Sequence, residues 1–234
     1  MDFREELVSQ FNKYNIALDN TQIEQFYRYY ELLIEWNEKI NLTAITEQSE
    51  VIEKHFIDSI LPYKAFKENS SIIDIGSGAG FPGIPLKILR PDLNITLLDS
   101  LNKRINFLNI VINELKLDNI VAIHGRSEEM AKMPKYREVF DYGTARAVAK
   151  LNILAEYTVP FIKVNGNFIA YKGQDADNEI LESKNAISKL YLKENTHLEF
   201  NLNENSRKIL IFNKTKQTPN IYPRGQNKPR KNPL

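Results

Sequence analysis

Residues 71–83 read Ser71-Ile72-Ile73-Asp74-Ile75-Gly76-Ser77-Gly78-Ala79-Gly80-Phe81-Pro82-Gly83, a β-branched run that leads into closely spaced glycines. The run predicts a buried strand, and Ile84 to Leu89 predict a helix after it. Because glycine has no Cβ, the backbone can turn tightly between them and approach a ligand closely. Asp99 closes a second apolar run about 20 residues later, the offset at which an acid accepts both ribose hydroxyls. The stretch predicts a site for a nucleoside-containing cofactor.

The register of the glycines distinguishes two such cofactors. Gly78 to Gly83 reads G-x-G-x-x-G, which is typical of NAD sites, but in that fingerprint the first glycine follows the strand directly. Gly76 holds that place here, and its register puts Phe81 at the third glycine. The register that begins at Gly76 reads Asp-x-Gly-x-Gly-x-Gly instead, which is typical of S-adenosylmethionine (SAM) methyltransferases. An acid at Asp74 suits the cationic methionine end of SAM and would repel a pyrophosphate. We therefore favour SAM, with the following contacts: Asp74, Gly76, Ser77, Gly78, Gly80, Phe81 and Asp99.

Length and composition narrow the class of protein. The 234 residues fit one α/β domain with a small appendage. The chain has no cysteine, which excludes disulfides, thiolate metal sites and a cysteine nucleophile, and indicates a reducing compartment. The three histidines lack metal-ligand spacing, so we expect no metal. No signal peptide is evident and no apolar run approaches the ~18 residues of a membrane span, so we expect a cytoplasmic, soluble protein.

The first part of the chain has helical spacing. Apolar residues recur at helical intervals from about residue 3 to 67, and Asp19 offers an N-cap before the second run. The segment 37–43 interrupts this second helix, and another helix begins over 50–59. We interpret residues 1–67 as a helical N-terminal cap, 68–215 as the SAM-binding domain and 216–234 as a C-terminal tail.

From Ser71 the pattern alternates between strands and helices, which favours a mostly parallel sheet. The predicted strands are 72–75, 95–98, 120–124, 139–144, 166–171, about 198–202 and 208–213. The predicted helices are 83–90, 102–117, 148–162 and 177–190. Only residues 203–206 separate the last two strands, which is too short for a parallel crossover, so these strands form an antiparallel hairpin. A seven-stranded α/β sheet with one antiparallel strand is the Rossmann-like class I methyltransferase arrangement.

The tail is basic and rich in proline. From Lys214 onward every charged side chain is Lys or Arg, and four prolines make the tail irregular instead of helical. Such asymmetry favours a polyanionic partner. A solvated tail without a partner would have the same composition.

Further segments, taken with the glycine stretch, carry a resemblance in order along nearly the whole chain. They are 36–45, His55-Phe56-Ile57-Asp58-Ser59, 74–85, Leu98-Asp99-Ser100-Leu101-Asn102-Lys103-Arg104, Phe107-Leu108, Gly125-Arg126-Ser127-Glu128-Glu129, 144–149, Tyr171-Lys172-Gly173, Tyr222-Pro223-Arg224 and Pro233-Leu234. This chain resembles the ribosomal RNA small-subunit methyltransferase G family, also called glucose-inhibited division protein B. Ser127 is a small departure, since many members carry alanine there.

The resemblance implies a helical cap on a class I domain and SAM-dependent methylation of guanine N7 at position 527 of 16S ribosomal RNA. It also implies a set of residues in the SAM pocket, namely Gly76, Phe81, Ser127, Glu128 and Arg146. Asp99 and Ser100 would lie at the ribose. The small ribosomal subunit, or an intermediate of its assembly, would be the partner. The sequence has no coiled-coil or symmetric interface motif, so we expect a monomer.

Guanine N7 suits the chemistry of these residues. It has an in-plane lone pair and no proton to remove, so the enzyme needs orientation and charge management more than a general base. Arg146 ends a predicted strand, where ligands bind in parallel sheets, and could donate to guanine O6, a phosphate or the SAM carboxylate. Arg126 and Lys172 end similar strands and are candidate catalytic or phosphate contacts. Candidate RNA contacts on helix surfaces and in the tail are Lys103, Arg104, Arg224, Lys228, Arg230 and Lys231.

Three rival functions stay open. One keeps SAM and changes the acceptor to transfer RNA, a protein or a small molecule. Another is an RNA-binding ribosome-assembly factor without catalysis. The last is an NAD-dependent oxidoreductase, which Phe81 disfavours.

Overall fold

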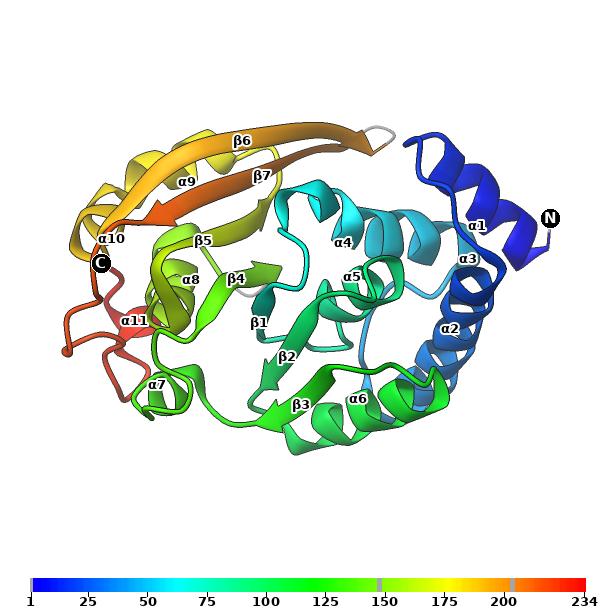
Figure 1. Ribbon diagram of the computed structural model, residues 1–234, viewed down its shortest axis with the longest axis horizontal. Coiled ribbons are helices and arrows are strands. Elements are labelled where there is room, and N and C mark those ends of the chain that lie inside the picture. The colour runs from blue at the N-terminus through cyan, green and yellow to red at the C-terminus, as the bar shows by residue number, and fades with distance from the viewer. Residues whose placement is uncertain (1, 147–148, 203–204) are drawn as a thin grey trace.

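The computed structural model describes residues 2–146, 149–202 and 205–234. Its centre is a seven-stranded sheet of order β3-β2-β1-β4-β5-β7-β6, with helices on both faces (Figure 1). The strands are β1 (Ser71–Ile75), β2 (Asn94–Asp99), β3 (Ile120–His124), β4 (Phe140–Arg146), β5 (Ile162–Lys172), β6 (Leu192–Leu202) and β7 (Asn205–Lys214). All seven predicted strands are confirmed.

The sheet is parallel from β3 to β5 and changes direction at β7. β1 pairs in parallel with β2 and β4, and β7 pairs antiparallel with both β5 and β6. The hairpin between β6 and β7 and the class I arrangement are thus confirmed. β6 begins at Leu192, earlier than predicted, because its first half is polar and solvent-exposed and gives no apolar signal, although it pairs with β7. The predicted turn residues 203 and 204 lie outside the described part of the chain.

The N-terminal helices cover one face of the sheet. They are α1 (Phe3–Asn12), α2 (Asn20–Ile40), α3 (Gln48–Val51), a π-helical turn (Ile52–Ile57), α4 (Asp58–Ile60) and a 3-10 turn (Tyr63–Ala65). Asp19 caps α2 as predicted, in a capping box with Gln22. α2 continues to Ile40 and ends where Asn41 adopts φ 49°, four residues later than the predicted interruption begins. The π-helical turn was not predicted.

The remaining helices are α5 (Gly83–Leu89), α6 (Asn102–Glu114), α7 (Ser127–Met130), α8 (Leu151–Thr158), a 3-10 turn (Val159–Phe161), α9 (Ala176–Glu182), α10 (Lys184–Lys189) and α11 (Lys228–Lys231). The prediction of one helix over 177–190 was wrong, because the helix is interrupted at the buried Ser183, between α9 and α10. The predicted helix 148–162 begins at a residue outside the described ranges, and its α-helical part ends early, at Thr158, before the 3-10 turn that contains Pro160. The prediction of a fully irregular tail was also wrong, since the short helix α11 forms there and carries Pro229 in its first turn, where proline is tolerated.

Alternating strand residues build a separate core on each face. Ile72 packs with the N-terminal helices, α5 and α6, whereas the adjacent Ile73 packs with α8 and α10. α2 contacts both α5 and α6, so the cap and the sheet share one apolar core. The boundary between residues 67 and 68 stays a prediction. No helix of the described residues has the length and hydropathy to cross a bilayer.

Candidate functional site

A cavity of about 460 Å³ lies at the carboxyl ends of β1 to β4, where ligands bind in open parallel sheets. We call it the larger cavity. Predicted site residues that line it are Gly76, Ser77, Gly78, Phe81, Asp99, Ser100, Arg104, Arg126, Ser127, Glu128, Arg146 and Arg230. Its volume lies within the range of small-molecule and cofactor sites.

The Asp99 carboxylate is fixed on the wall of the larger cavity by backbone donors. Its Oδ2 accepts from the amide of Gly78 at 2.9 Å, and its Oδ1 accepts from the amide of Leu101 at 2.9 Å. Gly78 adopts φ 60°, and a Cβ placed on it would have only Gly76 O, at 3.8 Å, as a near neighbour. The glycine turn therefore leaves space for a ligand beside an oriented carboxylate.

Two predicted cofactor contacts lie behind the turn instead of in the cavity. Asp74 is fully buried, and its Oδ2 accepts from the amide of Gly83 at 3.1 Å. Burial raises the pKa of Asp74 to about 7. A Cβ on Gly80 would lie 2.5 Å from Cδ1 of Ile84 and 2.8 Å from the hydroxyl of Tyr29. Neither residue lines the larger cavity: Asp74 braces the turn and Gly80 permits close packing, and their direct contact with a cofactor stays a prediction.

The segment after β3 forms the next part of the wall. Glu128 is buried, Arg126 is exposed, and both line the larger cavity. The hydroxyl of Ser127 donates to the carbonyl of Tyr157 in α8 at 2.5 Å. Serine at this position therefore ties the start of α7 to α8.

Arg146 is held by a polar cluster at the end of β4. Its Nη1 donates to Oδ2 of Asp58 at 2.8 Å and to the carbonyl of Lys54 at 2.9 Å, and its Nη2 lies 3.2 Å from Nδ1 of His55. Its guanidinium carbon lies 4.9 Å from the centre of the Phe81 ring. The predicted site residues Arg146 and Phe81 are thus brought together, and the guanidinium is oriented before any ligand binds.

His55 is neutral in this cluster. Burial, followed by the charge of Arg146, lowers the pKa of His55 to about 3. Nδ1 of His55 lies 3.2 Å from both Nη2 of Arg146 and the carbonyl oxygen of Lys54, and Nε2 lies 2.7 Å from the Thr43 hydroxyl. The His55 ring also stacks on Phe81, with centres 4.5 Å apart.

A smaller cavity of about 350 Å³ adjoins the larger one across Arg146, which lines both. Asp58, Tyr171, Lys172, Glu179 and Arg207 line this smaller cavity. Lys172, a predicted catalytic or phosphate contact, lies in this smaller cavity with Arg146, and its Nζ is 2.8 Å from Glu179. Burial lowers the pKa of Lys172. Nε of Arg207 donates to Oδ1 of Asp58 at 2.9 Å, so one buried carboxylate joins two guanidinium groups.

The predicted RNA contacts fall into separate groups. Lys103, Lys228 and Lys231 are exposed, whereas Arg104 lines the larger cavity, with its Nη1 3.4 Å from Oδ2 of Asp99. Arg224 makes two bonds to the buried Glu156, at 2.8 and 2.7 Å. The guanidinium of Arg224 therefore anchors the tail, and its contact with RNA stays a prediction.

Sequence reasoning missed several residues of the larger cavity, namely Leu42, Thr43, His55, Tyr157 and Asn227. They come from the N-terminal segment, α8 and the tail, far from the glycine turn in sequence. The His55 motif was noticed only as a resemblance. Its π-helical turn, a feature frequent at functional sites, has no clear sequence signal.

Known proteins match this chain along most of its length. The family model described as rRNA small subunit methyltransferase G matches residues 22–210. The chain is 47% identical over 234 residues to Ribosomal RNA small subunit methyltransferase G of Lactococcus lactis subsp. cremoris, covering 98% of each chain. It is 49% identical to the protein of that name from Streptococcus pneumoniae, covering 94% of each. The chain belongs to the rRNA small subunit methyltransferase G family. It is therefore a SAM-dependent methyltransferase.

Solved structures support the fold of this methyltransferase. A SAM-dependent methyltransferase from Aquifex aeolicus superposes with a TM-score of 0.53 at 15% identity, covering 70% of this chain and 92% of that one. TYW2 from M. jannaschii, in complex with AdoMet, gives 0.54 at 17% identity, covering 67% and 76%. At these identities the likeness concerns the class I fold alone.

The larger cavity fits SAM. Asp99 presents a carboxylate suited to ribose hydroxyls, Phe81 and Leu98 present apolar surface, and Gly78 leaves open space at the turn. The donors and acceptors present are those that a nucleoside requires. Among the described residues, no group of three His, Cys, Asp or Glu side chains could hold a metal ion.

Proposed function

We propose that this methyltransferase methylates N7 of guanine 527 in 16S ribosomal RNA. The observation that carries the proposal is the pair of adjoining cavities, of about 460 and 350 Å³, that share Arg146. One cavity suits SAM, and the other suits a base that has left its stack, as enzymes that modify bases require. The two relatives above are named for the small-subunit rRNA.

The smaller cavity offers groups that complement guanine. Lys172 supplies a donor for O6, and Glu179 supplies an acceptor for N1–H and the exocyclic amine; their charged atoms lie 2.8 Å apart. Uracil and cytosine lack the N7 acceptor, and adenine places an amine where guanine has O6. The arrangement therefore favours guanine.

The larger cavity holds the cofactor through Gly76, Gly78, Phe81, Asp99, Ser127 and Glu128. When bound, SAM supplies a methyl group on a positively charged sulfur. Arg146 orients the acceptor across the junction of the cavities while Asp58 balances its charge. Guanine N7 needs no general base, and His55 at this junction would be a weak one, because burial and Arg146 lower its pKa to about 3.

Exposed basic side chains supply contacts to the RNA backbone. Arg126 lies at the larger cavity, and Lys103, Lys228 and Lys231 are exposed. These contacts would make RNA binding depend on salt without selecting a base. We propose a monomer that acts in the cytoplasm, where small subunits assemble.

Methyl transfer from labelled SAM to separated acceptors tests the proposal. We expect label in 16S rRNA, supplied naked or as small subunits from cells lacking the enzyme, and none in transfer RNA or protein. Glu179→Gln should lower transfer more than Lys150→Gln, whose exposed ammonium pairs with Glu182 outside both cavities. Label found in transfer RNA alone would refute the proposed acceptor.

A further inference from the structure

Two residues of the C-terminal segment (residues 215–234), Asn227 and Arg230, line the larger cavity. They follow the last strand, β7, and line the same cavity as Ser127, Glu128 and Tyr157. α11 packs against α8 and lies near α7 in Figure 1. The segment that looked like an RNA-binding tail therefore reaches the cofactor site.

Arg137 anchors the beginning of the segment. Its Nη1 donates to the carbonyl of Tyr222 at 3.0 Å, and its Nη2 donates to the carbonyl of Thr218 at 2.8 Å. The neighbouring Glu138 accepts from the amide of Thr218 at 2.7 Å. These bonds fix the backbone of the segment on the methyltransferase domain.

A buried ion pair anchors the segment again, closer to the cavity. The carboxylate of Glu156 in α8 has an exposed fraction of 0% and accepts from the amide, Nε and Nη2 of Arg224 at 2.7 to 2.8 Å. The same Nη2 donates to the carbonyl of Asn232 at 2.9 Å, which closes the loop that carries Asn227 and Arg230. A carboxylate so buried requires its partner. The loop is thus held in place without RNA.

Asn227 and Arg230 both contact Tyr157. The Tyr157 hydroxyl donates to Oδ1 of Asn227 at 3.2 Å. Burial raises the pKa of Tyr157, and the charge of Arg230, together with a hydrogen bond to it, opposes this rise. The Tyr157 carbonyl accepts from Ser127 at 2.5 Å, so the segment is linked to the wall that follows β3.

We propose that the C-terminal segment completes the SAM site, with Asn227 and Arg230 contacting the adenine of the cofactor. With the ribose at Asp99, at the end of β2, the adenine would extend toward the segment after β3, where Asn227 and Arg230 line the same cavity. A guanidinium stacks on aromatic rings, and an amide matches the donors and acceptors of a purine edge. The proposal rests on SAM as the cofactor and not on which base is methylated.

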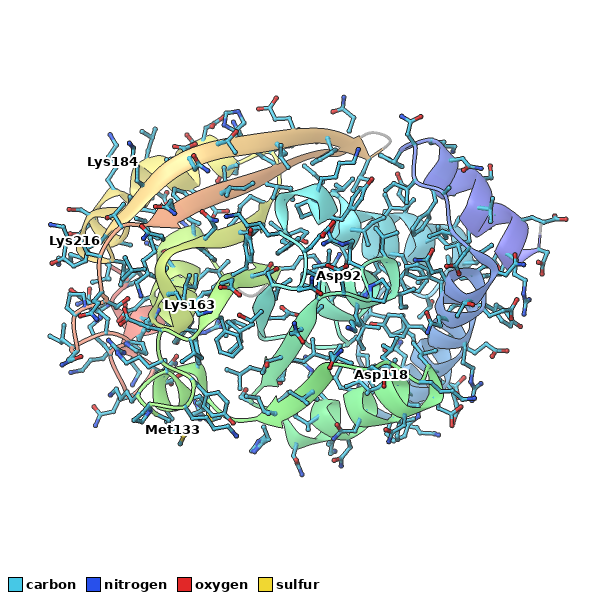
Figure 2. All side chains as sticks on the ribbon, viewed as in Figure 1. Asp92, Asp118, Met133, Lys163, Lys184 and Lys216 are labelled. Atoms are coloured by element: carbon cyan, nitrogen blue, oxygen red, sulfur yellow. The ribbon has the colours of Figure 1, made fainter. Side chains whose placement is uncertain are left out.

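Calorimetric titration of the full-length protein with S-adenosylhomocysteine, without RNA, tests the proposal. We expect Arg230→Ala and Asn227→Ala each to raise the Kd by roughly 3- to 30-fold. Arg230→Lys keeps the charge but loses the guanidinium plane, so it should also bind more weakly than the wild type. Lys216→Ala is the matched control, because it removes a cation of the same segment at the outer edge of the molecule, away from the cavity (Figure 2).

An unchanged affinity for S-adenosylhomocysteine would contradict the proposal. If Arg230→Ala and Asn227→Ala bound S-adenosylhomocysteine with the wild-type Kd and lost affinity only for 16S rRNA, the segment would serve RNA and the proposal would be wrong. Failure to methylate guanine would not affect this titration, so the two proposals fail independently.

Discussion

Oδ2 of Asp58 lies 2.8 Å from Nη1 of Arg146, and the exposed fractions of the two side chains are 6% and 11%. The other carboxylate oxygen accepts from Arg207 at 2.9 Å. Asp58 belongs to α4, Arg146 to β4 and Arg207 to β7, so this carboxylate joins the N-terminal helices to two strands of the sheet. Its position determines where the Arg146 guanidinium points.

Replacing Asp58 with alanine leaves the largely buried guanidinium of Arg146 and the partly exposed guanidinium of Arg207 without their carboxylate. We expect Asp58→Ala to lower the free energy of unfolding by about 3–5 kcal/mol and to abolish most methyl transfer. Urea unfolding and a transfer assay measure these effects. Glu182→Gln, which breaks an exposed pair with Lys150, should cost only about 0–1 kcal/mol. Equal stability of the two variants would contradict this assignment.

The raised pKa of Asp74 should make the free energy of unfolding depend on pH. Burial raises its pKa from 3.8 to about 7, so between these values the folded protein binds more protons than the unfolded chain. The stability of the wild type, relative to Asp74→Asn, should therefore fall as the pH rises from about 4 to 7, by up to about 4 kcal/mol.

Urea unfolding of wild type and Asp74→Asn at several pH values measures this difference. Asparagine keeps an oxygen acceptor for the amide of Gly83, so the variant isolates the charge. Parallel pH curves for the two proteins would show that Asp74 titrates normally when folded.

The glycines of the turn should separate stability from cofactor binding. Gly80→Ala places a Cβ 2.5 Å from Ile84 and 2.8 Å from Tyr29, at φ 103°, so we expect a loss of about 2–4 kcal/mol in unfolding free energy. Gly78→Ala meets no such neighbour and costs about 1–2 kcal/mol for its φ of 60°. Its methyl group enters the larger cavity, so it should weaken S-adenosylhomocysteine binding more than Gly80→Ala weakens it. Thermal unfolding and calorimetry check both; the reverse order would count against the account of the turn.

His55 should stay neutral well below its ordinary pKa. Burial and Arg146 lower that pKa to about 3, so the His55 ring resonances should not titrate between pH 8 and 5. Two-dimensional NMR of the imidazole groups measures this, and His55→Phe assigns the signal. A midpoint near 6.5 for His55 would mean that Arg146 does not lie against its ring.

The sequence allowed accurate prediction where one short stretch carries its own signal. The strand and glycine turn at 71–83, the acid at Asp99 and the hairpin of β6 with β7 were all predictable, because periodicity and spacing are local. The packing of Asp74 behind the turn was not predictable, because a carboxylate beside a glycine turn can face either the ligand or the turn.

Long-range contacts account for most of what was missed. His55 enters the site through a π-helical turn, and Arg224 finds its partner Glu156 across 68 residues of chain. No local pattern reports that a basic residue has a buried partner. The tail therefore resembled an RNA-binding segment by composition, although Arg224 is structural and Arg230 lies at the larger cavity.

The most direct measurement is mass spectrometry of nuclease fragments of 16S rRNA, from cells lacking the enzyme, after incubation with the purified protein and SAM. We predict one added methyl group on the fragment containing guanine 527, recovered as 7-methylguanosine and lost with Asp58→Ala. An unmodified fragment, from both naked rRNA and small subunits, would contradict the proposed activity.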